Sequence, residues 1–348
     1  MSEAVSANDV QDRMALGLRG QWYALMPSRW VAGDKPVQVT RLGEKLVVWR
    51  DSKGIAHVQR DVCPHRGAPL SLGRVIDDRI TCPYHGIQLD GTGTIKSVPA
   101  FPGCSLEGKH ALKTLPSMEL RDAIFAYFDS AEHPEPVPFD PPFEFASPQW
   151  SGMLCSGHWK SSHLLVHDNL VDPMHGSFLH AESFTLAYGA KQDKMAIEKT
   201  DKGFIVKRLE QQGVNFDWTE YCDTGAQWYR LDIPYPAGAG PGGPFRIIGF
   251  VTPIDRHNTQ VFFWRMREVD GWQRDAWRFM YRNRLEYRHW VVLEQDRVAV
   301  EGIEDDVTEM LYQHDIGVTH LRRLMQQTAR KQLDAAAKAK PATAHAAE

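Results

Sequence analysis

Two pairs of cysteine and histidine residues early in the chain have the spacing of metal ligands. Cys63 and His65 lie in the segment CPHRG, and after a further sixteen residues Cys82 and His85 lie in CPYHG. A thiolate sulfur and an imidazole nitrogen can bind a structural zinc ion, and they can also bind an iron–sulfur cluster. The spacing alone leaves both kinds of site open.

The loops that carry these ligands favour the cluster. Each loop has a proline directly after its cysteine, Pro64 or Pro83, and a glycine four residues after it, Gly67 or Gly86. Glycine lets the backbone approach a cluster closely and offer amide hydrogens to its sulfides. Each loop also supplies one thiolate and one imidazole. This suits a cluster in which one iron takes both cysteines and the other takes both histidines, whose neutral rings make that iron easier to reduce.

A second group of candidate ligands, without sulfur, lies in HDNLVDPMHGSFLH at residues 167–180. Asp172 and His175 are three residues apart and would share one face of a helix. His175 and His180 are five apart, which in a straight α-helix turns them roughly 140° from each other around the axis. We therefore predict that a helix is distorted or ends between these histidines, at Gly176 or at a π-type bulge.

Two imidazoles are an incomplete ferrous iron site, because the usual third ligand is a carboxylate that leaves coordination positions open for oxygen. The helical segment LEQDRVAVEGIEDD, at 293–306, offers several acids, among them Glu294, Asp296 and Glu301. A solvated acidic face is the ordinary explanation for most of them. The residues alone therefore leave the choice of carboxylate open.

The first group resembles a known motif. The segments CPHRGAPLSLGRV and ITCPYHGIQLDGTGTIKSVP are similar to the Rieske 2Fe–2S motif over about forty residues. The resemblance implies that Cys63 and Cys82 bind one iron of the cluster, and that His65 and His85 bind the other.

The second group resembles the catalytic domain of the Rieske non-heme iron oxygenases. The resemblance rests on Asn169, on the spacing from Asp172 to His175, on His180, and on an acidic helix more than a hundred residues later. In that family the aspartate of an acidic pair in this helix is the third ligand of a mononuclear Fe(II). That position falls on Asp296 here.

The acidic pair departs from the family pattern at one position. Gln295 stands where many relatives have glutamate. The resemblance still assigns the ligand to Asp296, with Glu294 as the alternative.

The resemblance implies a further role for Asp172. In this family the corresponding aspartate bridges a Rieske histidine of one subunit and an iron-binding histidine of its neighbour, because the two centres of one chain lie too far apart for fast electron transfer. This implies a homotrimer. A carboxylate at that place can accept hydrogen bonds from both imidazoles and fix their tautomers. Asn169 is expected beside the iron. From the residues alone, an aspartate before Pro173 is also an ordinary helix-start residue.

Composition excludes several classes of protein. The 348 residues carry a formal net charge of −4, so no basic field predicts binding to nucleic acid. No stretch approaches the roughly 18 consecutive apolar residues of a membrane helix, and the N-terminus is polar and acidic, unlike a signal peptide. We expect a cytoplasmic protein without a disulfide framework. The remaining cysteines are expected to be small core residues; they are Cys104, Cys155 and Cys222.

The pattern of the whole chain predicts an α+β protein. Short apolar runs between glycine-containing turns predict an N-terminal all-β domain, and a proline-dense segment at 130–148 marks its end. Later strand-like runs predict an antiparallel sheet, and stretches with helical spacing predict helices that flank it; by the resemblance this is a helix-grip, START-like domain. The predicted ranges are 1–18 for an N-terminal helix or extension, 19–134 for the Rieske 2Fe–2S domain, 135–332 for the catalytic domain and 333–348 for a disordered tail.

The resemblance implies a terminal oxygenase. A separate NAD(P)H-dependent reductase, with or without a ferredoxin, would supply electrons through the Rieske cluster, and O2 would be activated at the ferrous iron beside a small aromatic or apolar substrate. Ring dihydroxylation is the favoured reaction, and O- or N-demethylation is the alternative. A non-catalytic Rieske electron carrier is a rival of another class, but a carrier has no use for the second histidine pair.

The substrate pocket is expected among apolar side chains of the sheet and of the segment after His180. Arg230 and Arg246 are candidates for binding a substrate carboxylate, although surface ion pairs are the more frequent role of such residues. The glycine-rich segment 237–244 lacks the G-x-G-x-x-G spacing of a nicotinamide site and is expected to be surface or a loop over the pocket. The candidate pocket residues are Phe184, Leu186, Phe216, Trp218, Phe250 and Phe263.

Overall fold

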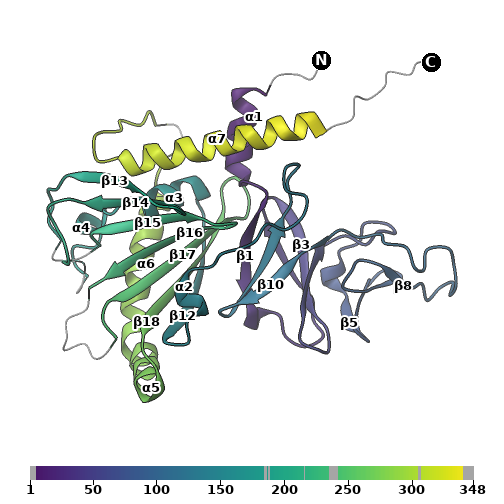
Figure 1. Ribbon diagram of the computed structural model, residues 1–348. Coiled ribbons are helices and arrows are strands. Elements are labelled where there is room, and N and C mark those ends of the chain that lie inside the picture. Colours follow the sequence, from purple (N-terminus) through teal and green to yellow (C-terminus); the bar gives the residue numbers. More distant parts are fainter. Residues whose placement is uncertain are drawn as a thin grey trace. The chain divides into compact units, whose positions relative to one another are not determined.

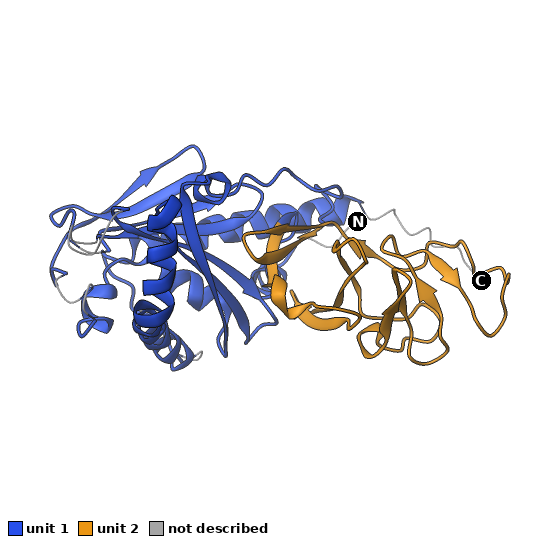
Figure 2. Cartoon of the chain, turned by 90° about the horizontal axis from the view of Figure 1, so that it is seen from below, with its two compact units in different colours: residues 1–21, 129–348 blue, residues 22–128 orange. Residues whose placement is uncertain are grey.

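The computed structural model describes residues 5–183, 186, 189–214, 216–234, 242–304 and 307–339. The chain divides into two compact units, which are residues 22–128 and residues 1–21 together with 129–348 (Figure 2). The unit of residues 22–128 (unit 2 in Figure 2) lies inside the predicted range 19–134. Helix α1 (Ala7–Leu16), from the predicted N-terminal extension, belongs to the other unit (unit 1).

The unit of residues 22–128 consists of small antiparallel sheets. Among the described residues the strand orders are β1-β11-β10, β2-β3-β4-β9 and β5-β6-β7-β8. Successive residues of β3 face opposite sides, so Leu46 packs in one hydrophobic cluster and Val47 in another, which also contains Cys63 and Cys82. The elements are β1 (Gln21–Pro27), η1 (Ser28–Trp30), β2 (Val37–Arg41), β3 (Glu44–Arg50), β4 (Ala56–Arg60), η2 (Leu70–Leu72), β5 (Arg74–Ile76), β6 (Arg79–Thr81), β7 (Gln88–Leu89), β8 (Ile95–Ser97), β9 (Thr114–Leu115), β10 (Ser117–Leu120) and β11 (Ala123–Phe128).

The unit of residues 1–21 and 129–348 is built on one large sheet (Figure 1). Among the described residues it has seven strands in the order β12-β18-β17-β16-β15-β14-β13, and all neighbours are antiparallel. The predicted fold class, an all-β domain followed by a domain with an antiparallel sheet and helices, is confirmed. The strands are β12 (Trp150–Trp159), β13 (Met195–Lys199), β14 (Gly203–Arg208), β15 (Trp218–Asp223), β16 (Gln227–Ile233), β17 (Phe245–Pro253) and β18 (Thr259–Glu268).

Helices pack against this sheet. Apolar residues of α1, α3, α6 and α7 share one hydrophobic cluster with residues of the strands, for example Val166, Leu293 and Leu321 with Phe204 and Tyr229. No helix in the described part of the chain is long and apolar enough to cross a membrane. The remaining helices are α2 (Phe143–Ala146), α3 (His163–Val171), α4 (Gly176–Leu179), α5 (Gly271–Met280), the π-helical turn η4 (Tyr281–Leu285), α6 (Glu286–Glu301) and α7 (Ile316–Ala339).

The C-terminal helix extends further than the predicted domain boundary. Helix α7 continues to Ala339, so the first residues of the predicted disordered tail, 333–348, are helical. Residues 340–348 lie outside the described part of the chain.

The helix before the two histidines ends earlier than predicted. Helix α3 stops at Val171, and Asp172 follows with extended backbone (φ −104°, ψ 102°). Asp172 and His175 therefore do not share a helix face, and that prediction is wrong. The reason is local: Pro173 disfavours helical geometry in the residue that precedes it. The one-turn helix α4 then begins directly after His175 and ends at Leu179, before His180. A helix therefore ends between the two histidines, as predicted, although it ends at Leu179 and not at Gly176.

A buried ion pair anchors the turn that carries these histidines. Arg208 Nε donates to Asp193 Oδ2 at 3.1 Å, and Arg208 Nη1 donates to Ser177 Oγ of α4 at 2.8 Å. Neither charged side chain has any exposed surface. The carboxylate of Asp193 also accepts hydrogen bonds from the backbone N–H groups of residues 209–211. The pair thus connects α4 to the sheet.

We expect Asp193→Ala to lower the free energy of unfolding by about 3–5 kcal/mol, because it leaves a buried guanidinium without its partner. Burial would raise the pKa of Asp193, but the backbone hydrogen bonds and Arg208 hold it at about 2. This stabilisation is therefore complete above about pH 4, the pKa of an unfolded aspartate, and is lost as the pH falls toward 2. Denaturant unfolding at about pH 7 and about pH 3 measures this stabilisation. The wild type and the variant should differ less in free energy of unfolding at the lower pH. An equal difference at both pH values would contradict the stabilising role of the Asp193 carboxylate.

Candidate metal centres

The two Cys–His loops of residues 22–128 have the same backbone construction. The N–H of Gly67 donates to the carbonyl of Cys63 at 2.9 Å, and the N–H of Gly86 donates to the carbonyl of Cys82 at 3.0 Å. Both glycines have positive φ, 76° and 72°, a conformation that other residues adopt only with strain. The glycines are therefore required by the turns that present the cysteines.

The four side chains of these loops fit a two-iron cluster. Cys63 and Cys82 are buried, whereas His65 and His85 are exposed, with ring centroids 4.7 Å apart. Ligands of one tetrahedral zinc ion would lie within about 4 Å of one another, given metal–ligand distances of about 2.1–2.3 Å. Among the described residues, no three of these four place ligand atoms within 4.8 Å of one another. Burial raises the pKa of the Cys63 thiol to about 11, so metal binding must displace its proton.

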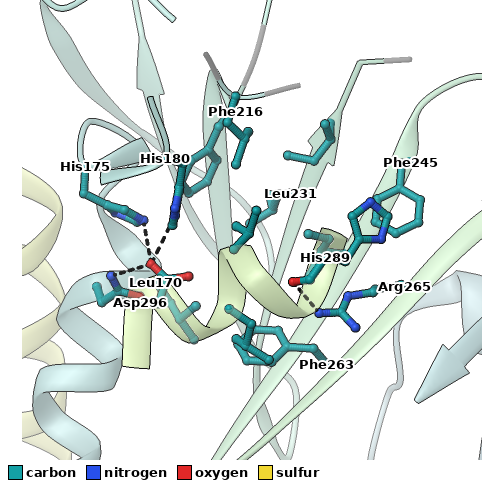
Figure 3. A pocket seen from close by; sticks show the side chains of 16 residues that line it. Leu170, His175, His180, Phe216, Leu231, Phe245, Phe263, Arg265, His289 and Asp296 are labelled. Atoms are coloured by element: carbon teal, nitrogen blue, oxygen red, sulfur yellow. Dashed lines mark hydrogen bonds and ion pairs between the residues drawn. The ribbon is translucent and has the colours of Figure 1, made fainter. Parts of the chain in front are cut away.

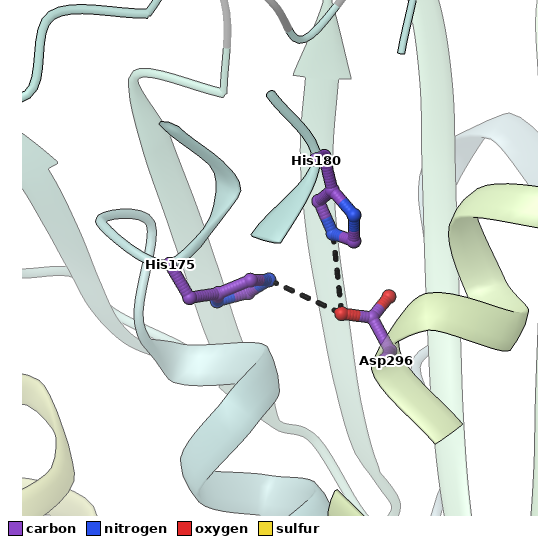
Figure 4. Close-up of side chains that lie close together, drawn as sticks. All are labelled: His175, His180 and Asp296. Atoms are coloured by element: carbon purple, nitrogen blue, oxygen red, sulfur yellow. Dashed lines mark ion pairs between the residues drawn. The ribbon is translucent and has the colours of Figure 1, made fainter. Parts of the chain in front are cut away.

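The second centre gathers His175, His180 and Asp296 (Figure 4). Asp296 Oδ1 lies 3.4 Å from His175 Nε2 and 3.1 Å from His180 Nε2. Ligands about 2.1 Å from one ion, at about 90–110°, would be separated by about 3.0–3.4 Å, so this spacing fits a shared metal. Among the described residues, this is the one group of three whose ligand atoms lie within 4.8 Å of one another. Two imidazoles and one carboxylate with open positions suit Fe(II).

Close packing holds the two histidines in this position. They flank helix α4, which begins at Gly176. A Cβ on Gly176 would lie 2.7 Å from Cδ1 of Phe216, so a larger residue would displace that ring. The Phe216 ring packs on His175 with centroids 5.4 Å apart. Asp296 reaches the same place from helix α6.

The two histidines favour the charged form of the Asp296 carboxylate, which can bind a cation. Burial alone would raise the pKa of Asp296, but hydrogen bonds and charge interactions with His175 and His180 hold it well below its usual range. Burial would lower the pKa of His175, but Asp296, with a smaller contribution from Asp172, raises it. A metal ion would replace the proton between these groups.

Side-chain amides contact two of the three candidate ligands. Asn169 Nδ2 donates to Asp296 Oδ1 at 3.3 Å. Gln295 Oε1 lies 2.9 Å from His180 Nδ1 and accepts its hydrogen, which leaves the lone pair of Nε2 directed at the centre. In the sequence, Gln295 was only a departure from the family pattern, and this contact was not predicted.

Replacing Gln295 by leucine should lower the affinity of the centre for Fe(II) by about 10- to 100-fold, because the His180 ring loses the acceptor that fixes its tautomer. Gln295→Glu keeps an acceptor at the same place and is the matched control. Anaerobic competition with a chelator measures the affinity. Equal affinities for the leucine variant and the wild type would show that the contact does not orient His180.

Asp172 lies at the edge of the centre. Its Oδ2 is 3.9 Å from His175 Nδ1, and its Oδ1 accepts a hydrogen bond from the N–H of Met174 at 2.7 Å. Among the described residues His175 Nδ1 has no hydrogen-bond partner, although it is buried. The Asp172 side chain is 30% exposed, so its carboxylate is accessible from outside the chain.

A cavity of about 90 Å³ adjoins the three candidate ligands (Figure 3). One water molecule needs about 10–15 Å³ on this measure, so the space holds a small organic molecule. Leu186, Phe216 and Phe263 line it, as predicted, whereas Trp218 and Phe250 do not. Phe250 packs on Phe145 and Trp264 instead, and Phe184 lies outside the described residues. The other apolar residues of the lining are Leu170, Leu231, Ile233, Phe245, Ile247, Val292 and Leu293.

Neither arginine considered for a substrate carboxylate lines this cavity. Arg230 pairs with Glu220 at 2.5 Å, and Arg246 pairs with Asp232 at 2.5 Å. Both border a separate groove, to which Gly243 of the glycine-rich segment also contributes; residues 237–241 of that segment lie outside the described part. The polar residues of the cavity that sequence reasoning missed are Arg265 and His289.

Comparison with known proteins agrees with both centres. Residues 21–116 match the family described as Rieske 2Fe-2S domain, and residues 159–331 match the vanillate O-demethylase oxygenase C-terminal domain. Protein TIC 55 of Arabidopsis thaliana is 29% identical over 59% of this chain, which spans about a third of its length (35%). Methylxanthine N3-demethylase NdmB of Pseudomonas putida is 25% identical over 78% of this chain and 76% of that protein.

Solved structures show the same fold. NdmB of Pseudomonas putida CBB5 superposes with a TM-score of 0.75 at 21% identity, over 94% of this chain and 96% of that one. The terminal oxygenase of carbazole 1,9a-dioxygenase from Novosphingobium sp. KA1 superposes with a TM-score of 0.77, also at 21% identity and over 94% and 96% of the two chains.

A Rieske domain followed by an oxygenase domain with a sheet and helices defines the class of Rieske terminal oxygenases. Both domain families match this chain in that order and cover most of its length. The chain belongs to the family of Rieske non-heme iron oxygenases.

Proposed function

We propose that this chain is the terminal oxygenase of a multicomponent system. It takes electrons from a separate NAD(P)H-dependent reductase, directly or through a ferredoxin, and transfers oxygen from O2 to a small aromatic or apolar substrate. The observation that carries the proposal is the convergence of His175, His180 and Asp296 beside an apolar cavity in a chain with a Rieske domain. A pure electron carrier would have no use for such a centre.

The residues of the two centres take distinct roles. When bound, the cluster supplies single electrons and the ferrous ion supplies the activation of O2. Asn169 holds the carboxylate of Asp296 and Gln295 holds the ring of His180, while the apolar lining excludes water from the substrate. The proposed cluster ligands are Cys63, His65, Cys82 and His85, and the proposed ligands of the mononuclear iron are His175, His180 and Asp296.

Oxidation at a methyl group next to a heteroatom, which ends in demethylation, is the reaction supported best. About half of the chain, residues 159–331, matches the C-terminal domain of vanillate O-demethylase oxygenase, and the relative NdmB is a methylxanthine demethylase. Ring dihydroxylation, favoured on the sequence alone, therefore becomes the second candidate. Both reactions would use the same centre, and they differ in which substrate carbon faces it.

A product screen tests the proposal. The purified holoenzyme, with a surrogate reductase and NADH, should consume O2 in the presence of methoxyarenes, N-methyl heterocycles or aromatic acids. Formaldehyde with a demethylated product would support demethylation, and a cis-diol would support dihydroxylation. A protein that transfers electrons but oxidises no compound would contradict the oxygenase function.

We also propose a homotrimer in which Asp172 connects the centres of neighbouring subunits, and a cytoplasmic location. The accessible carboxylate of Asp172 beside His175 supports the first of these. Sedimentation of the holoenzyme measures the oligomeric state, and a monomer would contradict the proposed trimer.

A further inference from the structure

The cavity contains a buried arginine at one end. Arg265 lies on β18 two residues after Phe263, so both side chains face the same side of the sheet, and both line the cavity. The arginine is 3% exposed. His175, His180 and Asp296 lie at the other end of the cavity from its guanidinium (Figure 3).

No carboxylate neutralises Arg265 among the described residues. Its Nη1 donates to Tyr281 Oη at 3.2 Å, its Nη2 donates to the carbonyl of His289 at 3.0 Å, and its guanidinium lies over the ring of Trp290 at 5.6 Å from the centroid. These contacts use only part of its N–H donors. By contrast, Arg208, on the same sheet, pairs with Asp193. Buried charges are normally paired, and Arg265 borders a cavity, so a group that enters the cavity from outside the chain can be its partner.

The polar side chains around Arg265 do not supply a negative charge. Burial raises the pKa of Tyr281, so its phenol stays neutral. Burial and the nearby Arg265 lower the pKa of His289 to about 3, so its imidazole is neutral as well. The guanidinium therefore brings a positive charge without an adjacent carboxylate to a cavity whose lining is mainly apolar between this end and the candidate metal ligands.

We propose that Arg265 determines substrate specificity by binding an anionic group, a carboxylate or a sulfonate, of a single-ring aromatic substrate. The ring would fill the apolar cavity and present its opposite side to His175, His180 and Asp296. A planar guanidinium binds such a group through two parallel hydrogen bonds. The inference rests on the proposed function for the role of the centre, but it concerns binding alone and can be tested without turnover.

Binding of matched probes to the full-length holoenzyme tests the inference. The probes are single-ring aromatic carboxylates and sulfonates, each paired with its neutral amide or sulfonamide, and calorimetry under anaerobic conditions measures affinity. At least one acid should bind the wild type about tenfold or more tightly than its neutral partner, because a charge-assisted hydrogen bond is lost with the charge. If no acid is preferred, the inference is wrong.

The substitutions Arg265→Met and Arg265→Lys assign the preference to this residue. Arg265→Met should abolish the preference for acids, and Arg265→Lys should retain part of it, since the charge stays and the planar fork is lost. Arg230→Lys, a paired arginine outside the cavity, is the matched control and should leave the preference unchanged. A preference that survives Arg265→Met would refute the assignment; if that variant does not fold, an undiminished preference in Arg265→Lys would do so.

The inference and the proposed function can fail separately. Acids that bind through Arg265 but are never oxidised would contradict the oxygenase reaction alone. Neutral aromatic compounds that are oxidised, with no preference for acids in binding, would contradict the role of Arg265 alone.

Discussion

Asp296→Ala should remove the mononuclear iron and leave the Rieske cluster in place. The two remaining imidazoles lose the charged ligand between them, and turnover should fall to background. Iron analysis should give about two irons per chain in place of about three, while the absorption of the cluster is unchanged. Metal analysis and O2 uptake on the same preparation measure both effects.

Glu294→Ala is the matched control for this experiment. Glu294 is the alternative acid of the sequence analysis, only two residues away, but its side chain is 52% exposed and pairs with Arg297. Its replacement should retain about three irons per chain and full turnover. If Glu294→Ala lost the iron and Asp296→Ala kept it, the assignment of the third ligand would be reversed.

Asp172→Asn should lower turnover by about 100-fold or more while both metal centres stay loaded. The carboxylate lies 3.9 Å from His175 Nδ1 and is accessible from outside the chain, and an amide in its place offers one acceptor oxygen instead of two. Electron transfer from the cluster can be followed by stopped-flow absorption after the reduced protein is mixed with O2 and substrate. Reoxidation of the cluster should be slower in the variant than in the wild type.

Asp168→Asn is the control for this variant. Asp168 lies four residues earlier, on α3, and pairs with Arg322 at 2.6 Å. The Asp168→Asn substitution should lower the free energy of unfolding, because it weakens the pair with Arg322. The reoxidation rate of the cluster should stay close to that of the wild type. An Asp172→Asn variant that reoxidises its cluster as fast as the wild type would remove the bridging role.

The candidate cluster ligands and the two candidate histidines could be proposed from the sequence, because their residue types and spacing reflect local chemistry. Cys63 and Cys82 lie in short loops whose turns require glycine at one position. Residue type and spacing are therefore enough to predict the site. The break at Asp172 was also readable, since Pro173 acts on its immediate neighbour. The three-residue spacing from Asp172 to His175 fits a helix, but the effect of the proline on the backbone of Asp172 prevails.

The candidate for the third ligand and the lining of the adjoining cavity were decided by tertiary structure. Glu294 and Asp296 have the same chemistry and lie on different faces of α6. The packing of α6 on the sheet, after the π-helical turn η4, places Asp296 at the two histidines and Glu294 in solvent. In the same way, Arg265 is one polar residue in a strand pattern, and Arg230 is another. Only the assembled sheet and helices bury the first in the cavity and pair the second with acids, because burial and charge pairing depend on residues distant in the sequence.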